Sequence, residues 1–172
     1  MKRMTVAVLL VWALLSSVAW AGDCQNEHGT VSISDAGIAT TGSELVDYNK
    51  FGAPKGHSLG SVIFWTGVLV NGSVQSGGTF SATGSSLTVI GNGDYGVPKG
   101  VIFSGSFEGP VTWTLVSQTH SKLVFVLAGH VIGINRKGRK VGANTTQTIV
   151  TTKGQLAQGV GHIMYGVLVP DT

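Results

Sequence analysis

The stretch Tyr95–Ser117, which reads YGVPKGVIFSGSFEGPVTWTLVS, decides the fold class. After a Pro-Lys-Gly turn, large apolar residues alternate with small polar ones. Gly109-Pro110 interrupts this run, and the alternation then resumes. Residues two positions apart point to the same face of a strand, so each half presents one apolar and one polar face. A turn, a strand, a second turn and a second strand are typical of an antiparallel sheet with one face in water.

The rest of the chain repeats this pattern in short segments. Alternating or apolar runs are predicted as strands, separated by turns rich in Gly, Asn and Asp. These runs are 30–34, 61–70, 73–75, 79–82, 86–90, 122–135, 141–152 and 159–169. Asn71-Gly72 is predicted as a tight hairpin turn, whereas 35–50 is ambiguous. No apolar period of 3.6 persists for three turns beyond the N-terminal segment, so little helix is expected.

These features predict an all-β domain of roughly ten strands. An antiparallel β-sandwich, of the jelly-roll or immunoglobulin-like type, is our first expectation, and a closed barrel is the second. The 26 glycines are then expected in turns and where strands approach closely, rather than in a disordered linker. An outer-membrane barrel is a less favoured alternative, because the strands are short for a membrane span and Pro170 ends the last one.

The N-terminal segment predicts export. Lys2 and Arg3 precede an apolar run at 6–18, which is too short to span a bilayer comfortably. Ala19-Trp20-Ala21 follows and matches the small-x-small pattern that signal peptidase recognises. We therefore expect a cleaved signal peptide at 1–21 and a secreted or periplasmic protein, with an uncleaved membrane anchor as the alternative.

Cleavage would leave a single all-β domain at 22–172, whose first residues, 22–29, are polar and expected to be flexible. No transmembrane segment is expected in this mature chain. Loss of the two basic residues lowers the formal net charge from +3 to +1, which argues against a nucleic-acid partner. Cys24 is the only cysteine, so no intrachain disulfide can form, and an unpaired thiol is a better interpretation than a catalytic one.

An aromatic-Gly-x-Pro-Lys-Gly hexamer occurs twice, at 51–56 and at 95–100. Proline favours the second position of a type I turn and glycine the fourth, so both hexamers are predicted as such turns. The simpler interpretation is two similar but unrelated turns. The more specific one is a paired loop surface that displays Phe51, Lys55, Tyr95 and Lys99.

A run of basic residues at 136–140 is predicted as the tip of a hairpin. Such a tip could bind an anionic polysaccharide or lipid headgroups. A solvated hairpin end that discourages edge pairing explains the charges as well. Together with the hexamers, this tip gives the candidate ligand-binding residues, which are Phe51, Lys55, Tyr95, Lys99, Arg136, Lys137, Arg139 and Lys140.

Catalytic signatures are weak. Gly56–Gly60 matches the G-x-S-x-G nucleophile elbow, but a β run rather than a helix follows it, so we attribute the match to coincidence. The histidines lack the spacing of a metal site, and no cofactor is expected. Trp113 alternates with apolar neighbours and is expected in the core rather than in a sugar-stacking platform. The alternative is a secreted enzyme or metal-binding protein whose site is assembled from separate strands by His57, His120, His130 and His162.

The run from Gly60 to Leu115, with GSVIFWTGVLVNGS, GGTFSATGSS and GNGDYGVPKGVIFSGSFEGPVTWTL, resembles uncharacterised Gly/Ser/Thr-rich secreted β-proteins of soil bacteria. The resemblance implies an exported β-domain and no known activity, so it assigns no functional residues. We therefore expect a non-catalytic exported protein with a binding or structural role. Its partner is expected to be a polysaccharide or an envelope protein.

Overall fold

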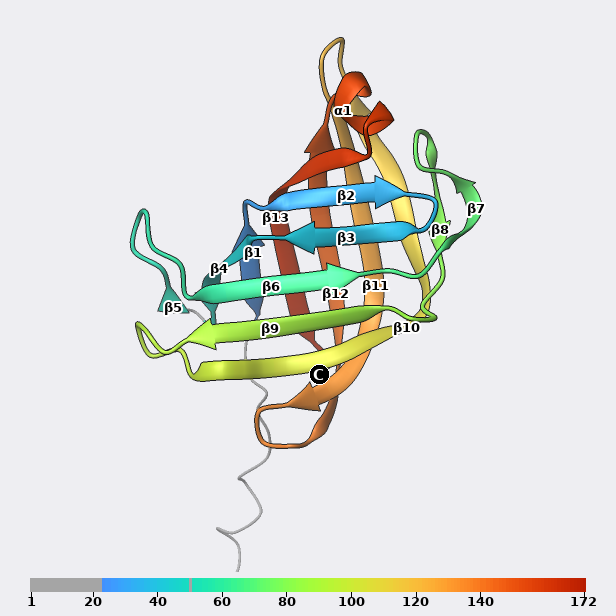
Figure 1. Ribbon diagram of the computed structural model, residues 1–172. Coiled ribbons are helices and arrows are strands. Elements are labelled where there is room, and N and C mark those ends of the chain that lie inside the picture. Colours follow the sequence, from blue (N-terminus) through green and yellow to red (C-terminus); the bar gives the residue numbers. More distant parts are fainter. Residues whose placement is uncertain (1–22, 50) are drawn as a thin grey trace, which may run out of the picture.

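The computed structural model describes residues 23–49 and 51–172, except for the side chain of Phe51. The predicted signal peptide at 1–21 lies outside the described residues. The described chain forms thirteen strands and one short helix (Figure 1). The elements are β1 (Cys24–Glu27), β2 (Thr30–Ser34), β3 (Gly37–Thr41), β4 (Ser43–Tyr48), β5 (Phe51–Gly52), β6 (Gly60–Trp65), β7 (Leu69–Ser73), β8 (Gly77–Phe80), β9 (Ser86–Asn92), β10 (Lys99–Gln118), β11 (Leu123–Asn135), β12 (Lys140–Thr151), α1 (Lys153–Ala157) and β13 (Val160–Pro170).

Eight antiparallel strands close into a barrel, in the order β6-β9-β10-β11-β12-β13-β2-β3 and back to β6. Two of these strands are extended beyond a bend. β1 leads into β2 through His28-Gly29, and β3 leads into β4 through Gly42, with positive φ at all three bend residues. The β7–β8 hairpin pairs with β10, and β5 pairs with β4, so both lie outside the ring.

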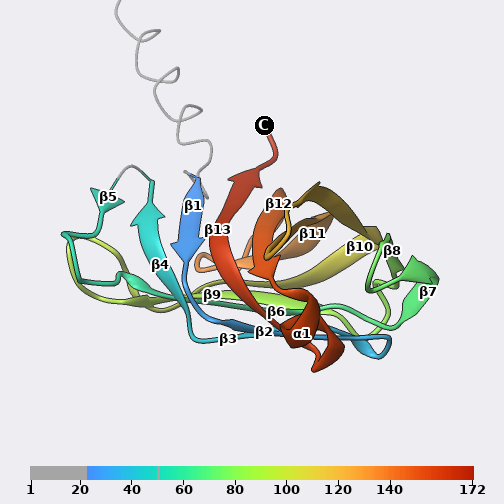
Figure 2. The same cartoon turned by 90° about the horizontal axis from the view of Figure 1, so that it is seen from above.

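The all-β prediction is confirmed, but the β-sandwich that we expected first is wrong. β2, β3, β6 and β9 form one wall, and β11, β12 and β13 cross behind it (Figure 1). Seen from above, the barrel is flattened, which gives it the outline of a two-layered sandwich (Figure 2). β10 connects the walls: residues before Gly109-Pro110 pair with β9, those after it pair with β8, and β11 accompanies both halves. A sandwich would leave free edges where this long bent strand closes the sheet.

The interior is filled by the apolar face of the alternating strands. The side chains of Val111, Trp113, Phe125 and Leu127 are all buried. The rings of Trp113 and Phe125 stack with their centroids 4.3 Å apart and an interplanar angle of 2°. Trp113 Nε1 donates a hydrogen bond to the carbonyl of Val74 at 2.9 Å. The prediction that Trp113 belongs to the core is confirmed, and the filled interior leaves the functional surface to the outside of the barrel.

Two local expectations are wrong. Residues 22–29 were expected to be flexible, but 24–27 form β1, which pairs with β13 on one side and with β4 on the other. Asn71-Gly72 was expected to be a hairpin turn, but it lies within β7, and the turn falls at 74–76. Gly72 has a positive φ because the β7–β8 pairing is irregular there. It lies next to the register shift between Leu69 and Asn71.

The two hexamers are not the matching type I turns that we predicted. In the first, the amide of His57 donates to the carbonyl of Pro54, so Pro54 opens the turn and does not occupy its second position. In the second, Val97 donates to Asp94 around Tyr95-Gly96, and both central residues have positive φ, as in a type I′ turn. The two copies of the sequence motif therefore adopt different backbone conformations.

Candidate functional site

The two hexamer loops nevertheless lie side by side, at the left of the barrel in Figure 1. β6 begins after the first loop and β9 ends before the second, and these two strands pair with each other. The side chain of Asn92 donates to the carbonyl of Ser58 at 2.8 Å. The rings of His57 and Tyr95 meet edge to face, with centroids 5.9 Å apart. The predicted paired loop surface therefore has a physical basis in strand pairing rather than in turn type.

An open groove of about 700 Å³ runs beside the first loop. The loop residues 53–57 form one wall, Val46 of β4 contributes an apolar patch, and Glu27, His28 and Glu44 line the other side. Glu27 and Glu44 are directly opposite each other in the β1–β4 pair. His28 Nδ1 lies 3.5 Å from Glu44 Oε2, and the φ of His28 is +59°, a conformation that is uncommon for residues other than glycine.

The lining of this groove suits a ligand rich in hydroxyl groups. The carboxylates of Glu27 and Glu44 can accept hydrogen bonds, and the ammonium of Lys55 can donate them. The His57–Tyr95 ring pair stands at the edge of the loop wall. Sequence reasoning found Lys55 and Tyr95 but missed both glutamates and His28. Glu27 lies on β1, His28 directly follows it, and Glu44 lies on β4, so these residues meet only because β1 pairs with β4, which the expectation of a flexible segment at 22–29 did not include.

The basic tip lies between β11 and β12, at the bottom of the barrel in Figure 1, and its backbone is held firmly. The buried side chain of Asn135 accepts hydrogen bonds from the amides of Lys137 at 2.9 Å and Arg139 at 3.0 Å. The amide of Arg136 donates to the carbonyl of Ile102, which fastens the tip to the beginning of β10. The tip therefore presents its charges from an ordered turn.

We call the surface formed by Lys55, Tyr95, Lys99 and the tip residues 136–140 the basic rim. Figure 1 shows the backbone that carries these residues, with the hexamer loops at the left of the barrel, β10 starting after the second loop, and the tip at the bottom. Within the described chain, the cationic side chains of the rim are exposed and take part in no ion pair. Phe51 lies on β5 beside this rim, but its side chain is outside the described part of the chain. The structure thus places Lys55, Tyr95 and Lys99 at the two neighbouring hexamer loops and the basic residues 136–140 on a turn that is bonded to Ile102 of β10.

The histidines do not assemble into the site that the alternative function requires. His130 on β11 is opposite Asn144 of β12, whereas His162 on β13 is opposite Val150 of the same strand. Six residues along a strand separate these rows by about 20 Å. His120 lies in the turn between β10 and β11, and His57 is in the first hexamer loop. Among the described residues, no group of three or more His, Cys, Asp or Glu side chains could hold a metal ion.

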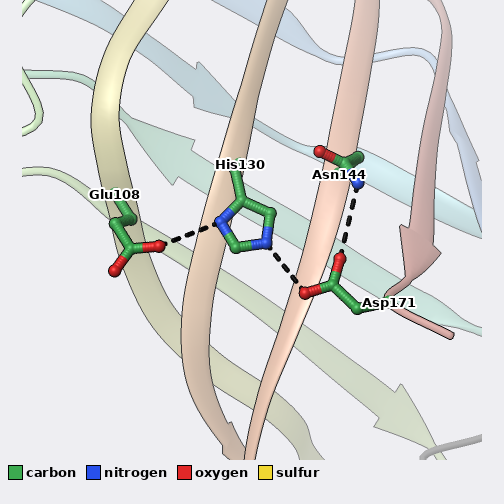
Figure 3. A network of polar contacts seen from close by, with 4 residues as sticks. All are labelled: Glu108, His130, Asn144 and Asp171. Atoms are coloured by element: carbon green, nitrogen blue, oxygen red, sulfur yellow. Dashed lines mark hydrogen bonds and ion pairs between the residues drawn. The ribbon is translucent and has the colours of Figure 1, made fainter.

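His130 instead forms a polar cluster on the outer wall (Figure 3). Its Nδ1 lies 3.2 Å from Glu108 Oε2, and its Nε2 lies 2.9 Å from Asp171 Oδ2. Asn144 Nδ2 donates to the other carboxylate oxygen of Asp171 at 3.4 Å. The hydrogen bond to Asp171 is the main cause that raises the pKa of His130 above 6.5, against a smaller opposing effect of desolvation. The carboxylates flank opposite edges of the ring, so they do not converge on one cation, and neither nitrogen is free to act on a substrate.

A second polar cluster, which we call the amide cluster, is buried where β12, β13, β1 and β4 lie side by side. Asn26 Nδ2 donates to Gln147 Oε1 and to Ser43 Oγ, both at 2.8 Å. Gln147 Nε2 donates in return to Asn26 Oδ1 at 3.2 Å and to Thr145 Oγ1 at 3.0 Å. Every amide hydrogen and carbonyl oxygen of the two side chains is thus used, so the cluster supports the fold and leaves no group for a ligand.

Cys24 is buried beside this cluster and is a free thiol. Desolvation by burial, reinforced by the negative charges of Asp23 and Asp47, raises the pKa of Cys24 to about 12. Burial also raises the pKa of Tyr48, its partner in the β1–β4 register. Since the thiolate is the reactive form of cysteine, Cys24 is protonated and unreactive at neutral pH in the folded protein.

Comparison of this chain with models of protein families, with curated proteins and with solved structures finds no match. The interpretation of the site therefore depends on its own geometry. Separately, no helix within 23–49 or 51–172 is long and apolar enough to cross a membrane.

Proposed function

We propose that this protein is an exported, non-enzymatic binding module that holds an acidic polysaccharide along the basic rim. The observation that carries the proposal is a row of exposed cations on ordered turns, none of which is neutralised by an ion pair within the described chain. Basic residues that only keep a protein soluble do not require a turn whose backbone is held by hydrogen bonds to a buried side chain. Fixed turns limit the entropy that is lost when a ligand binds.

A polymer of sugar acids matches both parts of this surface. Its carboxylates would pair with Lys99 and with the tip residues 136–140, where Arg136 and Arg139 can form bidentate contacts. Its hydroxyl groups would exchange hydrogen bonds with the groove beside Lys55, and a pyranose ring could pack on Tyr95, which is 47% exposed. A net charge of only +1 in the predicted mature chain favours such local recognition over general attraction to polyanions.

The proposal is tested by the affinity of the purified mature protein for polygalacturonate, with uncharged dextran as the control polymer. One variant, the rim variant, replaces Arg136, Lys137, Arg139 and Lys140 with Gln. The double variant Arg136→Gln/Arg139→Gln is compared with the control Lys122→Gln/Lys153→Gln, which removes the same number of charges. Lys122 and Lys153 are exposed and lie in the β10–β11 turn and in α1, at the top of the barrel in Figure 1. We expect the rim variant to bind at least about tenfold more weakly, the double variant to bind more weakly than its control, and the control variant to bind like the wild type.

Salt provides an independent arm of the same experiment. Raising the ionic strength from 0.05 to 0.5 M should weaken wild-type binding strongly and that of the rim variant only slightly, since exposed charges are screened. Equal binding to dextran and polygalacturonate, or equal losses in the rim and control variants, would contradict the proposal. If neither polymer binds, and a pull-down from an envelope fraction loses a protein only in the rim variant, the partner is an envelope protein and the polysaccharide proposal fails.

A further inference from the structure

Beyond this binding function, we propose that Glu108, His130 and Asp171 form a pH-dependent latch, which holds the segment after β13 across the outer wall of the barrel more firmly under mildly acidic conditions than at higher pH. The latch lies apart from the basic rim, and its action does not depend on any ligand. Its parts come from three places in the chain that the topology brings into one row (Figure 3).

The contacts of Asp171 show what the latch would fasten. β13 ends at Pro170, which is opposite Ala143 of β12. The amide of Asp171 then donates to the carbonyl of Gly142 at 3.0 Å, so the segment still follows β12. The Asp171 carboxylate reaches over β12 to His130 on the next strand, β11. Glu108 on β10 holds the far side of the ring. The imidazole of His130 thus links the segment after β13 to β11 and β10, the two strands that come after β12 in the sheet.

The absence of a side chain at Gly142 is independent evidence that the sheet accommodates the contact between Asp171 and His130. A Cβ atom at this position would clash with Asp171 Oδ2 and would lie 3.0 Å from His130 Nε2. The φ of Gly142 is not in the positive region, so its backbone does not require glycine. The space that a side chain would occupy is used by the carboxylate–imidazole contact.

The protonation state of the ring decides whether both contacts are favourable. An imidazolium donates a hydrogen bond from each nitrogen and offsets part of the charge of two carboxylates. A neutral ring carries one proton, so one carboxylate would face a nitrogen lone pair. The groups that face the ring are Glu108 from β10, Asp171 from the segment after β13, and Asn144 from β12, which bonds Asp171.

The direction of the pH effect follows from these contacts. The pKa of His130 is raised above 6.5, first by the hydrogen bond to Asp171. A raised pKa means that the folded, latched form binds the proton more tightly than the unlatched form does. The contribution of the ring to the latch is therefore fully present below about pH 6.5 and is lost as the pH rises through the higher pKa of the folded state.

The test is an NMR titration of the histidine side chains between pH 5 and pH 9 in the wild type and in three variants. Asp171→Asn should lower the titration midpoint of His130 most, and Glu108→Gln should lower it less. Gly142→Ala keeps every charge but blocks the contact, so it should lower the midpoint nearly as much as Asp171→Asn. The resonances of His162, on the same wall, serve as the internal reference.

The second readout is the heteronuclear NOE of the Asp171 backbone amide, which reports fast motion of the segment. We expect an amide that is more rigid at pH 5.5 than above the His130 midpoint, whereas in Asp171→Asn its mobility should be the same at both pH values. The same His130 midpoint in the wild type and in Asp171→Asn would overturn the latch. An Asp171 amide whose mobility does not change with pH would overturn it too. If Gly142→Ala does not fold, Asp171→Asn and Asp171→Ala decide, because that residue is exposed.

Discussion

Gln147 and Lys140 are long polar side chains on the same strand, β12, and they have opposite surroundings. The amide of Gln147 is fully buried, and each of its hydrogens and its oxygen has a protein partner. Lys140 is exposed at the basic tip and has no ion pair within the described chain. The same contrast holds between the amide cluster and the basic rim as a whole.

The contrast separates polar groups that hold the protein together from those that are free to act. A buried polar group that loses its partner costs far more free energy than an exposed one, because water cannot replace the lost hydrogen bond. Stability should therefore be sensitive to the amide cluster and insensitive to the basic rim. Binding should show the reverse. Three variants of the amide cluster and the basic rim test this division, and the partly exposed His130 cluster is expected to lie between the two in its effect on stability.

Gly166→Ala should be the most damaging. Gly166 lies on β13 between Asn26 of β1 and Gln147 of β12, and a Cβ atom there would clash with both amide oxygens. Separating the two amides would leave buried donors without acceptors, so we expect a loss of about 3 kcal/mol in the free energy of unfolding. Urea denaturation measures it.

The matched control for this variant is Gly154→Ala in α1. A Cβ atom there meets nothing nearer than 4.0 Å, and alanine is the better helix former. This control should leave stability unchanged or raise it by up to about 1 kcal/mol. A Gly166→Ala protein as stable as the control would show that the amide cluster is not needed.

Thr145→Val should have an intermediate effect. The hydroxyl of Thr145 accepts a hydrogen bond from Gln147 at 3.0 Å and donates one to the carbonyl of Val167 at 2.9 Å. Valine keeps the shape but removes both bonds, so we expect a loss of about 1–2 kcal/mol. The neighbouring Thr146→Val, on the exposed face of the same strand, should change stability by less than about 0.5 kcal/mol. Equal effects at the two positions would contradict a specific role for the buried hydroxyl.

The pH dependence of stability should be smaller still. Because the pKa of His130 is raised in the folded state, its contribution is fully present below about pH 6.5 and is lost as the pH rises through the folded-state value. Both carboxylate partners are about half exposed, so we expect well under 1 kcal/mol. Thermal unfolding at pH 6 and pH 8 should differ less in Asp171→Asn than in the wild type. Identical pH profiles in the two proteins would show that the contact between His130 and Asp171 does not contribute to the pH dependence of stability.

Neutralising the tip should have the least effect on stability. Replacing Arg136, Lys137, Arg139 and Lys140 with Gln removes no ion pair of the described chain. The backbone of the turn is held by Asn135, which the variant keeps. We expect a change within about 0.5 kcal/mol in urea denaturation, although we also expect the same variant to bind an acidic polysaccharide more weakly. A large loss of stability would mean that the tip has a structural role after all.

Local features of the fold could be predicted, whereas its closure could not. The alternation of residues 30–34 (TVSIS) predicted β2 with the bounds that the structure has. The basic turn at 136–140, between two long predicted strands, predicted the hairpin of β11 and β12. Alternation tells which face of a strand is buried, and it does so equally in a sandwich and in a barrel. Closure depends on pairs such as β3–β6 and β6–β9, which no local pattern specifies.

The candidate site shows the same limit. Exposed cations on turns were found because charge and turn residues are local signals. The partners in the latch are 41 residues apart and those in the amide cluster are 121 apart, so no spacing in the sequence reveals them. One signal for Gln147 was present: it shares its alternation phase on β12 with Ala143 and Ile149, which are apolar and buried. A polar residue in phase with buried apolar ones indicates a buried hydrogen-bond partner.

The burial of Cys24 also bears on how the protein behaves in oxidising surroundings, such as those that its predicted leader implies. With its pKa raised to about 12 and its sulfur enclosed by β13 and β4, the thiol can neither form a covalent link to another chain nor progress toward sulfenic acid while β1 stays paired. Alkylation of this single sulfur would therefore report detachment of the first strand. A band of disulfide-linked dimer on a non-reducing gel would likewise mark the unfolded fraction of a sample, since one cysteine per chain can link only two chains.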